Sequence, residues 1–244
     1  MKAILLVAGV GRRLSNPDHP KSLLVFGGQT LLERHIHALE AAGCSHLTVV
    51  VGHQASMIRD VLGTVATKMP ITVRENPDFK EGSVVSLWVA REDLDGKEDV
   101  VVMDGDVLYP PALLTRLRDE GGPSAFLLDV RSDETGEEMM VGVKGGRARR
   151  IARRVGKDDP AKGWDAVGES VGFTKFGAEH QAALRAALEA HVAAGKRNTE
   201  YEAVYDTFLD DHPVGYVPVG DVAWTEIDFE EDVRRAREEI LPHI

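Results

Sequence analysis

Short apolar runs alternate with helical patterns through the first half of the chain, and this alternation is the feature that most constrains its fold. Four runs are predicted as buried strands: 3–8, 46–52, 70–75 and 99–104. Amphipathic patterns follow the first three of them at 30–43, 54–66 and 83–91. Strands that are apolar on both faces and alternate with helices are typical of a parallel sheet covered on both sides. We therefore expect an α/β fold with a doubly wound, mostly parallel sheet of the Rossmann-like type.

The pattern changes in the second half of the sequence. Residues 124–176 contain short strand-like stretches with glycine turns, which predict β-hairpins added to a mixed sheet. Helical patterns return at 178–194 and 200–209, and a last strand is expected at 214–220. A terminal helix follows, with four apolar residues on one face: Phe229, Val233, Ala236 and Ile240. Because no linker or internal repeat interrupts this order, residues 1–244 are expected to form a single domain.

The overall charge excludes some classes of partner. The formal net charge of −11 argues against nucleic acid and against an anionic membrane surface, since both favour positive proteins. The only cysteine, Cys44, fits a reducing compartment. The apolar start at 3–8 is followed at once by Arg12 and Arg13, unlike a secretory signal, and no run approaches the roughly 20 apolar residues of a membrane helix. We expect a cytoplasmic protein with small substrates.

The turn after the first predicted strand combines glycines with positive charge. Gly9 and Gly11 let backbone N–H groups approach an anion, and Arg12, Arg13 and Lys21 add fixed positive charge. Ligands bind at the carboxyl ends of strands in open α/β sheets, so this turn predicts a polyphosphate site. Its spacing matches neither the P-loop nor the three-glycine dinucleotide fingerprint.

Acidic residues follow two later segments of the chain. Asp104 ends the strand predicted at 99–104, and Asp106 follows two residues later. Both would face the same crevice as the first turn, where carboxylates suit magnesium. The same Asp-Gly-Asp sequence also favours a simple turn. Near the C-terminus, Asp228 with Glu231 forms a capping-box-like pair at the start of the last helix.

These motifs together resemble the nucleotidyltransferase superfamily, which includes NDP-sugar pyrophosphorylases and cytidylyltransferases that activate phosphocholine and similar phosphoalcohols. The resemblance is carried by "LLVAGVGRRL", "PKSLL", "MDGDVLY" and "TEIDFEED". It implies that Asp106 and Asp228 bind Mg²⁺, with Glu226 as the alternative acid at the second position. It implies a nucleotide site made of these residues: Ala8, Gly9, Gly11, Arg12, Arg13, Lys21, Gly82, Ser83 and Asp104. Ser83 fits equally well as the N-cap of the helix predicted at 83–91.

The resemblance implies the reaction as well. We expect Mg²⁺-dependent transfer of a nucleoside monophosphate, CMP from CTP, to a phosphorylated or phosphonate alcohol of the phosphocholine, aminoethylphosphonate or inositol phosphate type, with release of pyrophosphate. Lys21 would bridge the α-phosphate and the acceptor phosphate, and Arg13 would bind the β- and γ-phosphates. The alternatives are a sugar-1-phosphate nucleotidyltransferase and a nucleotide-sensing module without catalysis.

The acceptor side is expected within the β-rich insertion at 131–176 and the helix that follows it. Trp164, Glu169, Tyr201 and Glu202 would frame a cationic head group, or would be core aromatics and surface acids. The eight basic residues in 144–162 predict a solvated hairpin leaning over an anionic substrate. The sequence does not specify whether two chains form a homodimer.

Overall fold

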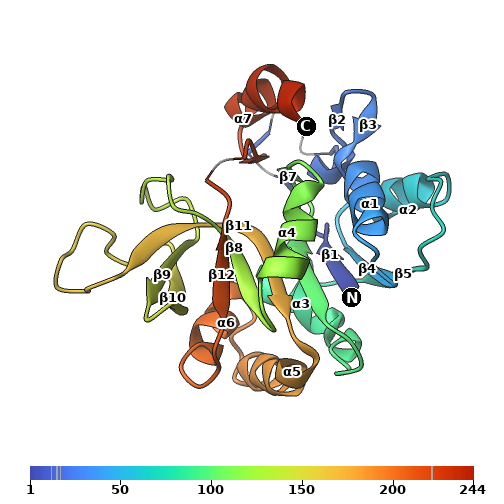
Figure 1. Cartoon of the computed structure of the whole chain (residues 1–244). Coiled ribbons are helices and arrows are strands. Elements are labelled where there is room, and N and C mark those ends of the chain that lie inside the picture. The colour runs from blue at the N-terminus through green and yellow to red at the C-terminus, as the bar shows by residue number, and fades with distance from the viewer. Residues whose placement is uncertain (12, 15, 17, 221) are drawn as a thin grey trace.

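The computed structural model describes residues 1–11, 13–14, 16, 18–220 and 222–244. Its centre is a nine-stranded sheet in which seven strands run in the order β10-β9-β11-β6-β1-β4-β5 (Figure 1). Four of these strands are parallel: β1 (Lys2–Leu6), β4 (His46–Val51), β5 (Ile71–Glu75) and β6 (Val100–Asp104). The doubly wound, mostly parallel sheet expected from the sequence is thereby confirmed.

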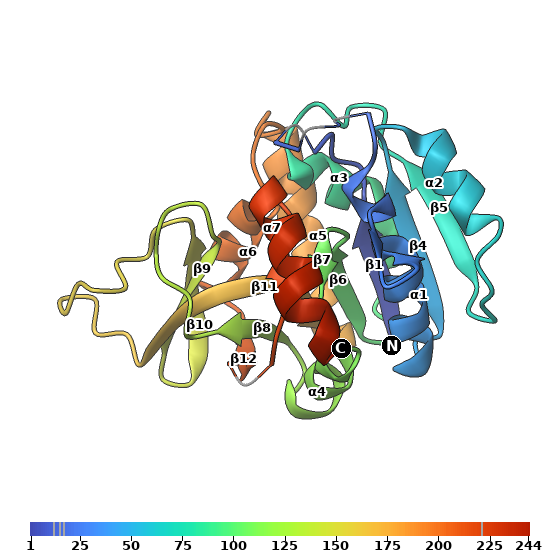
Figure 2. The same ribbon diagram turned by 90° about the horizontal axis from the view of Figure 1, so that it is seen from above.

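Helices cover both faces of this sheet (Figure 2). One face buries the apolar sides of α1 (Leu31–Ala41), α2 (Ala55–Leu62) and α4 (Ala112–Glu120). The other face buries those of α3 (Ser83–Val89), α5 (Ala178–Ala193) and α6 (Glu202–Phe208). Thr30 and Glu33 form a reciprocal capping box that fixes the start of α1, as the sequence predicts for Thr30. Among the described residues no helix is long and apolar enough to cross a membrane.

The second half of the chain extends the sheet with antiparallel strands. The hairpin of β9 (Met140–Lys144) and β10 (Arg147–Ala152) pairs with the first part of β11 (Ala166–Phe176). The last part of β11 pairs with β6, so this one long strand connects the hairpin to the parallel core. On the other side of β11, β8 (Ala125–Asp129) pairs with it and with β12 (Gly215–Pro218).

Short elements join the C-terminal segment to the N-terminal half. The two-residue strand β13 (Thr225–Glu226) pairs with β7 (Val107–Leu108), directly after β6. A single 3₁₀ turn at Lys21–Leu23 leads into the small hairpin of β2 (Val25–Phe26) and β3 (Gln29–Thr30). In Figure 1 the C-terminal segment lies beside this hairpin, and the two share an apolar cluster: Leu14, Phe26, Leu31, Leu108, Ile227, Val233, Ala236 and Ile240.

The terminal helix differs from its prediction at the first turn. The terminal helix begins as α7 (Glu230–Arg235). It continues as a π-turn over Ala236–Ile240 and ends in a 3₁₀ turn over Leu241–His243. A separate 3₁₀ turn, Arg91–Asp93, follows α3 in the middle of the chain. Phe229 precedes the helix and is 43% exposed, so it does not share the buried face of Val233. The carboxylate of Asp232, not Glu231, accepts the backbone N–H groups of Asp228 and Phe229 at 2.9 and 2.7 Å. Asp228 is therefore not used as a helix cap.

Candidate active site

Three charged side chains from distant parts of the chain meet at the carboxyl ends of β1 and β6. Lys21 Nζ lies 2.9 Å from Asp106 Oδ2 and 2.5 Å from Asp228 Oδ1. Asp106 follows β6, and Leu6 at the end of β1 is level with Asp104 at the end of β6. Asp228 reaches the same point because β13 pairs with β7 and Ile227 N–H donates to Asp106 O at 2.9 Å.

The carboxylates of Asp106 and Asp228 keep the Lys21 side chain positively charged. Burial alone would lower the pKa of Lys21, but the carboxylates of Asp106 and Asp228 outweigh burial and hold its pKa above the ordinary value. The ammonium therefore stays protonated at neutral pH. The aliphatic part of Lys21 lies against Gly11, where a Cβ would be 3.0 Å from Lys21 Cγ and where φ is +62°. A glycine is needed at position 11 for both reasons.

Glu226 is a third carboxylate at the same place. One oxygen from each of Asp106, Glu226 and Asp228 lies within 4.8 Å of the others. Side chains alternate along an extended segment, so Glu226 and Asp228 share one side while Ile227 is buried between them. Burial first, and then the negative charges of Asp106 and Asp228, raise the pKa of Glu226 well above its ordinary value. Both acids named for the second metal position therefore lie near Asp106, and three oxygen donors fit a hard divalent ion such as Mg²⁺.

Arg13 completes this charged group. Its guanidinium donates to Asp228 Oδ2 at 2.9 Å, lies 3.5 Å from Glu137 Oε2 and stacks 5.2 Å from the centre of the Phe229 ring. Because the Arg13 side chain is 43% exposed, it can exchange these partners for an anion from solvent. Arg12, the other arginine of the turn, lies outside the described residues.

A cavity of about 370 Å³ opens beside this charged group. It brings together these sequence-predicted residues: Ala8, Gly9, Arg13, Gly82, Ser83, Asp104, Asp106, Tyr201, Glu202 and Asp228, together with Glu226. Gly11 and Lys21 line a smaller adjoining cavity of about 80 Å³, which also contacts Gly9 and Asp106. The glycine turn thus lies between the two spaces.

Gly82 and Ser83 reach the cavity at the start of α3. Gly82 is the N-cap and Ser83 the first helical residue, so the interpretation of Ser83 as the N-cap is wrong. Instead, Ser83 Oγ accepts the backbone N–H of Tyr201 at 3.1 Å, and Gly82 N–H donates to Arg197 O at 2.8 Å. These bonds fix the segment that precedes α6 against the start of α3.

That segment brings Tyr201 and the buried Glu202 to Asp104 at the end of β6. Tyr201 Oη donates to Asp104 Oδ2 at 2.7 Å, and Glu202 is only 8% exposed. Burial, then the charges of Glu202 and Asp106, raise the pKa of Asp104 well above its ordinary value. Burial also raises the pKa of Glu202, to about 7. Within the described parts of the chain, neither carboxyl group forms an ion pair.

Trp164 and Glu169 lie outside this cavity. The indole of Trp164 covers Gly142 in the neighbouring strand, where a Cβ would be 2.8 Å from the ring, and its Nε1 donates to Val155 O at 3.0 Å. Trp164 therefore packs within the hairpin region. Glu169 lines an adjoining cavity of about 270 Å³ that shares three carboxylates with the first: Glu137, Glu226 and Asp228. Burial raises the pKa of Glu169 to about 7.

Sequence reasoning missed several residues that line the cavity. Ser86 lies on α3 and the others lie on loops: Phe79, Glu81, Glu137, Met139, Arg153 and Glu200. Salt bridges connect two of these acids to arginines, Arg153 to Glu200 and Arg197 to Glu81. Arg153 belongs to the basic run at 144–162, and Glu81 and Glu200 stand next to Gly82 and Tyr201, so the sequence held a signal for these three residues.

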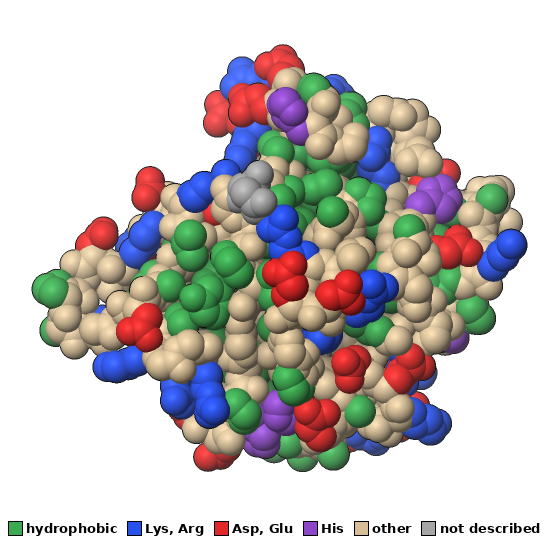
Figure 3. Space-filling model, in the orientation of Figure 1, with side chains coloured by type: hydrophobic (Ala, Val, Ile, Leu, Met, Phe, Trp, Pro, Cys, Tyr) green, Lys and Arg blue, Asp and Glu red, His purple; other side chains and the backbone are tan. Residues whose placement is uncertain are grey.

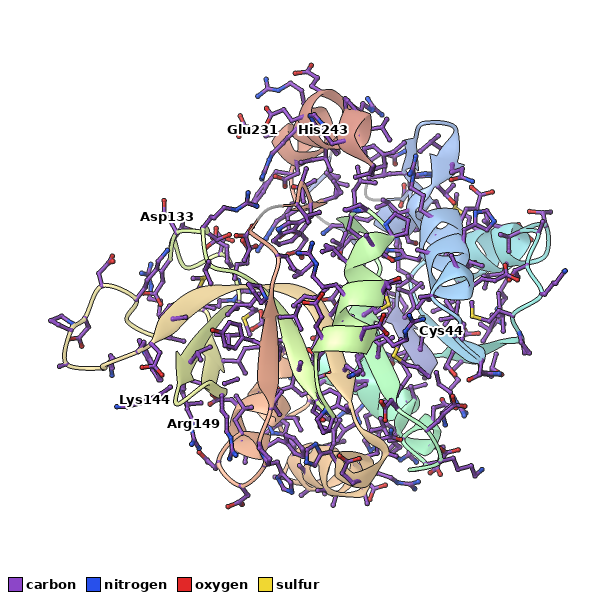
Figure 4. The ribbon with its side chains drawn as sticks, viewed as in Figure 1. Cys44, Asp133, Lys144, Arg149, Glu231 and His243 are labelled. Carbon is purple, nitrogen blue, oxygen red and sulfur yellow. The ribbon has the colours of Figure 1, made fainter. Side chains whose placement is uncertain are left out.

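The basic run at 144–162 does not lean over the cavity as a whole. Figure 3 shows basic side chains over the β9–β10 hairpin, and in Figure 4 Lys144 and Arg149 point outward from it. Arg150 pairs with Asp206 on α6. Only Arg153 of this run lines the cavity. Most of the other basic side chains lie on the outer surface of the hairpin, and Arg150 contacts α6.

Comparison with known proteins identifies the family. The chain belongs to the MobA-like NTP transferase domain family, whose model matches residues 3–216. The nucleotidyltransferase resemblance drawn from the sequence motifs is thereby confirmed.

Two curated relatives carry more specific names. The chain is 35% identical to a CMP-5'-(3-aminopropyl)phosphonate synthase of Streptomyces rubellomurinus over 120 residues, which cover 48% of this chain and 19% of that protein. It is 30% identical to a bifunctional IPC transferase and DIPP synthase of Rubrobacter xylanophilus over an alignment of 247 residues, which covers 98% of this chain and 52% of that protein. The chain thus spans about half the length of these relatives, or less.

Solved structures show the same fold. The CTP:phosphocholine cytidylyltransferase of Streptococcus pneumoniae superposes with a TM-score of 0.76 at 20% identity, over 97% of both chains. The inositol-1-phosphate CTP transferase of T. maritima superposes with a TM-score of 0.73 at 22% identity, over 95% of this chain and 90% of that one. A UDP-glucose pyrophosphorylase also reaches 0.73, at 15% identity over 96% of both chains. The fold alone therefore does not separate acceptor classes.

Proposed function

We propose that this chain is a cytidylyltransferase that transfers CMP from CTP to a small phosphorylated or phosphonate alcohol and releases pyrophosphate. One observation carries the proposal: Lys21 contacts Asp106 and Asp228 at the end of a glycine turn, beside a cavity large enough for a small ligand. The relatives named as CMP-phosphonate synthase and IPC transferase support the choice of cytidine and of a phosphorus-containing acceptor.

The acceptor brings its own nucleophile, a phosphate or phosphonate oxygen, so the protein must hold two anions in line and neutralise their charge. Lys21 would contact both the α-phosphate and the acceptor oxygen. Arg13 and the backbone N–H groups of Gly9 and Gly11 would hold the β- and γ-phosphates. The start of α3 at Gly82 and Ser83, with Asp104, would receive the nucleoside.

Asp106, Asp228 and Glu226 would hold Mg²⁺, since their oxygens lie close enough together and are the ligand type that this ion prefers. The ion would supply charge neutralisation to the triphosphate and to the departing pyrophosphate. The remaining contribution of the chain is positional. The β7–β13 pairing keeps Asp228 near Asp106, so the carboxylates are in place before substrate arrives.

The cavity wall supports an acceptor that carries a cationic group. Eight carboxyl groups and two guanidinium groups line the cavity. One of these carboxyl groups, Glu202, is assigned neither to the nucleoside nor to Mg²⁺; it forms no ion pair among the described residues and lies beside the phenol of Tyr201. A protonated amine or a trimethylammonium group would neutralise such a wall, whereas the hydroxyl groups of inositol would not. This favours aminoalkylphosphonates and phosphocholine over inositol 1-phosphate.

Pyrophosphate release tests the proposal. Each of CTP, UTP, GTP and TTP is supplied with aminoethylphosphonate, phosphocholine, inositol 1-phosphate or glucose 1-phosphate in the presence of Mg²⁺. We expect turnover with CTP and a cationic acceptor. Selective use of glucose 1-phosphate with UTP or TTP would replace the proposal by a sugar-1-phosphate nucleotidyltransferase. Tight CTP binding without pyrophosphate from any acceptor would replace it by a nucleotide-sensing module.

A substitution tests the acceptor class separately. Glu202→Gln keeps the shape of the side chain and removes its charge. We expect it to raise the KM for the cationic acceptor by about tenfold or more, as loss of one charged contact does, and to leave the KM for CTP nearly unchanged. Glu120→Gln, an exposed change at the end of α4, is the matched control. Equal KM values for both variants would exclude Glu202 from acceptor binding.

A further inference from the structure

The Lys21 ammonium contacts two of the carboxylates that are proposed to bind the metal. It contacts one oxygen of Asp106 and one of Asp228, at 2.9 and 2.5 Å, and the Lys21 side chain is only 15% exposed. These are two of the three carboxylates whose oxygens lie within 4.8 Å of one another. The third, Glu226, forms no ion pair among the side chains that the structure describes. The Lys21 ammonium therefore occupies the space between these carboxyl groups, while Arg13 contacts the other oxygen of Asp228.

An ammonium group and a divalent ion cannot share this place without strong repulsion. Two like charges at contact distance repel several times more strongly at the effective dielectric of a protein surface than in water, and a divalent ion doubles the repulsion of a monovalent one. Lys21 must therefore leave its carboxylate oxygens when a divalent ion takes them. It needs another anion in exchange, because a buried ammonium without a partner is costly.

The glycine turn offers the place to which Lys21 can move. Lys21 lines the cavity of about 80 Å³ together with Gly9 and Gly11, and its stem lies against Gly11 with no side chain between. The backbone at Lys21 is held by the 3₁₀ turn, in which Leu24 N–H donates to Lys21 O at 3.0 Å. Rotation of the side chain can therefore carry the ammonium toward the turn while the backbone stays in place.

We propose that Lys21 and the divalent ion exchange on Asp106 and Asp228, so that the protein loads the metal tightly only when a nucleotide phosphate accepts the lysine. The inference rests on the proposed function and adds the order in which its ligands bind. It makes metal and nucleotide binding mutually dependent, and such coupling is reciprocal between the two ligands. Free divalent ions would then compete with Lys21, whereas the nucleotide would remove that competition.

Binding of Mn²⁺ alone, followed by electron paramagnetic resonance, tests the exchange without any turnover. The probe is used with the full chain as wild type, Lys21→Met and Lys2→Met. Lys2 is a matched control, because it forms a salt bridge of 2.6 Å with Asp95 at the start of β1, far along the strand from the site. We expect Lys21→Met to bind Mn²⁺ at least about tenfold more tightly than wild type, and Lys2→Met to bind like wild type.

Thermal unfolding gives a second readout. Without metal, Lys21→Met should melt below wild type because Asp106 and Asp228 lose the Lys21 ammonium, and Mn²⁺ should raise its melting temperature more than that of wild type. The added change Asp228→Asn should abolish the gained Mn²⁺ affinity, which places the ion at this site. Equal or weaker Mn²⁺ binding by a folded Lys21→Met would overturn the inference. Absence of pyrophosphate release would instead contradict the proposed function and leave the Mn²⁺ comparison intact.

Discussion

Gly82→Ala should separate the start of α3 from the segment that carries Tyr201 and Glu202. A Cβ at position 82 would lie 1.9 Å from the carbonyl oxygen of Thr199 and 2.5 Å from its amide nitrogen. Ordinary Cβ contacts begin at 3.4 Å, so the two segments must move apart by about 1.5 Å. Because the obstacle is backbone on both sides, no side-chain rotation can relieve the contact.

The cost follows from the bonds that this movement breaks. Gly82 N–H donates to Arg197 O at 2.8 Å, and Val84 N–H donates to Thr199 O at 3.2 Å. A shift of about 1.5 Å carries both beyond hydrogen-bonding distance. Each buried group left without a partner costs about 1–3 kcal/mol, so we expect the free energy of unfolding to fall by about 3 kcal/mol. That is a large part of the roughly 5–15 kcal/mol typical of a folded domain.

Urea unfolding followed by circular dichroism measures this change, and the fluorescence of Trp88 on α3 adds a signal from the affected helix. Gly9→Ala is the matched control, because a Cβ there meets nothing within 4 Å. We expect its stability to stay within about 0.5 kcal/mol of wild type. A Gly82→Ala protein as stable as Gly9→Ala would show that the contact between α3 and Thr199 is not the constraint we infer.

Three further predictions follow from the site and its surroundings. Lys21→Ala and Asp106→Ala should each lower kcat for pyrophosphate release by about 10²- to 10³-fold with unchanged circular dichroism, since each removes one electrostatic contact; near-normal rates would contradict their roles. Ser22→Ala should raise the free energy of unfolding by about 1 kcal/mol in urea titrations, because Ser22 Oγ is buried and unpartnered among the described residues; a loss of stability would refute this. Burial raises the pKa of Glu169 from 4.5 to about 7, so its stabilising effect is complete below pH 4.5 and is lost as the pH rises through 7. Glu169→Gln should therefore match wild type near pH 4.5 and exceed its stability at pH 8, by about 3 kcal/mol at most, and equal pH profiles would exclude the shift.

The sequence predicts the parallel half of the molecule closely. The strand expected at 46–52 is observed at His46–Val51, and Thr30 caps the helix that begins at Leu31. Their signals are local, since an apolar run or a capping residue determines structure within a few residues. The helix expected at 54–66 ends earlier, at Leu62, because the turn at Gly63 stops it.

The rest depends on contacts that leave no local pattern. The strands β7 and β13 have two residues each, too few for any periodicity, yet their pairing brings Asp228 to Asp106. The family resemblance supplied Asp228 as a ligand where the local pattern favoured a helix cap. The sequence leaves Trp164 open as either a ligand-binding or a core aromatic, and the choice depends on the missing side chain of Gly142 in another segment. Acids such as Glu137 and Glu200 reach the cavity through loop conformations that composition does not encode.

The pairing of residues 107–108 with 225–226 also orders events during synthesis. A ribosome that has translated the first 110 residues has already made the glycine turn, Lys21 and Asp106, but the acids that complete the group are still more than a hundred codons away. A nascent chain of that length therefore lacks Glu226 and Asp228, and the three carboxyl groups come together only once β13 has been made. Completion of this charged group therefore depends on the last part of the chain to leave the ribosome.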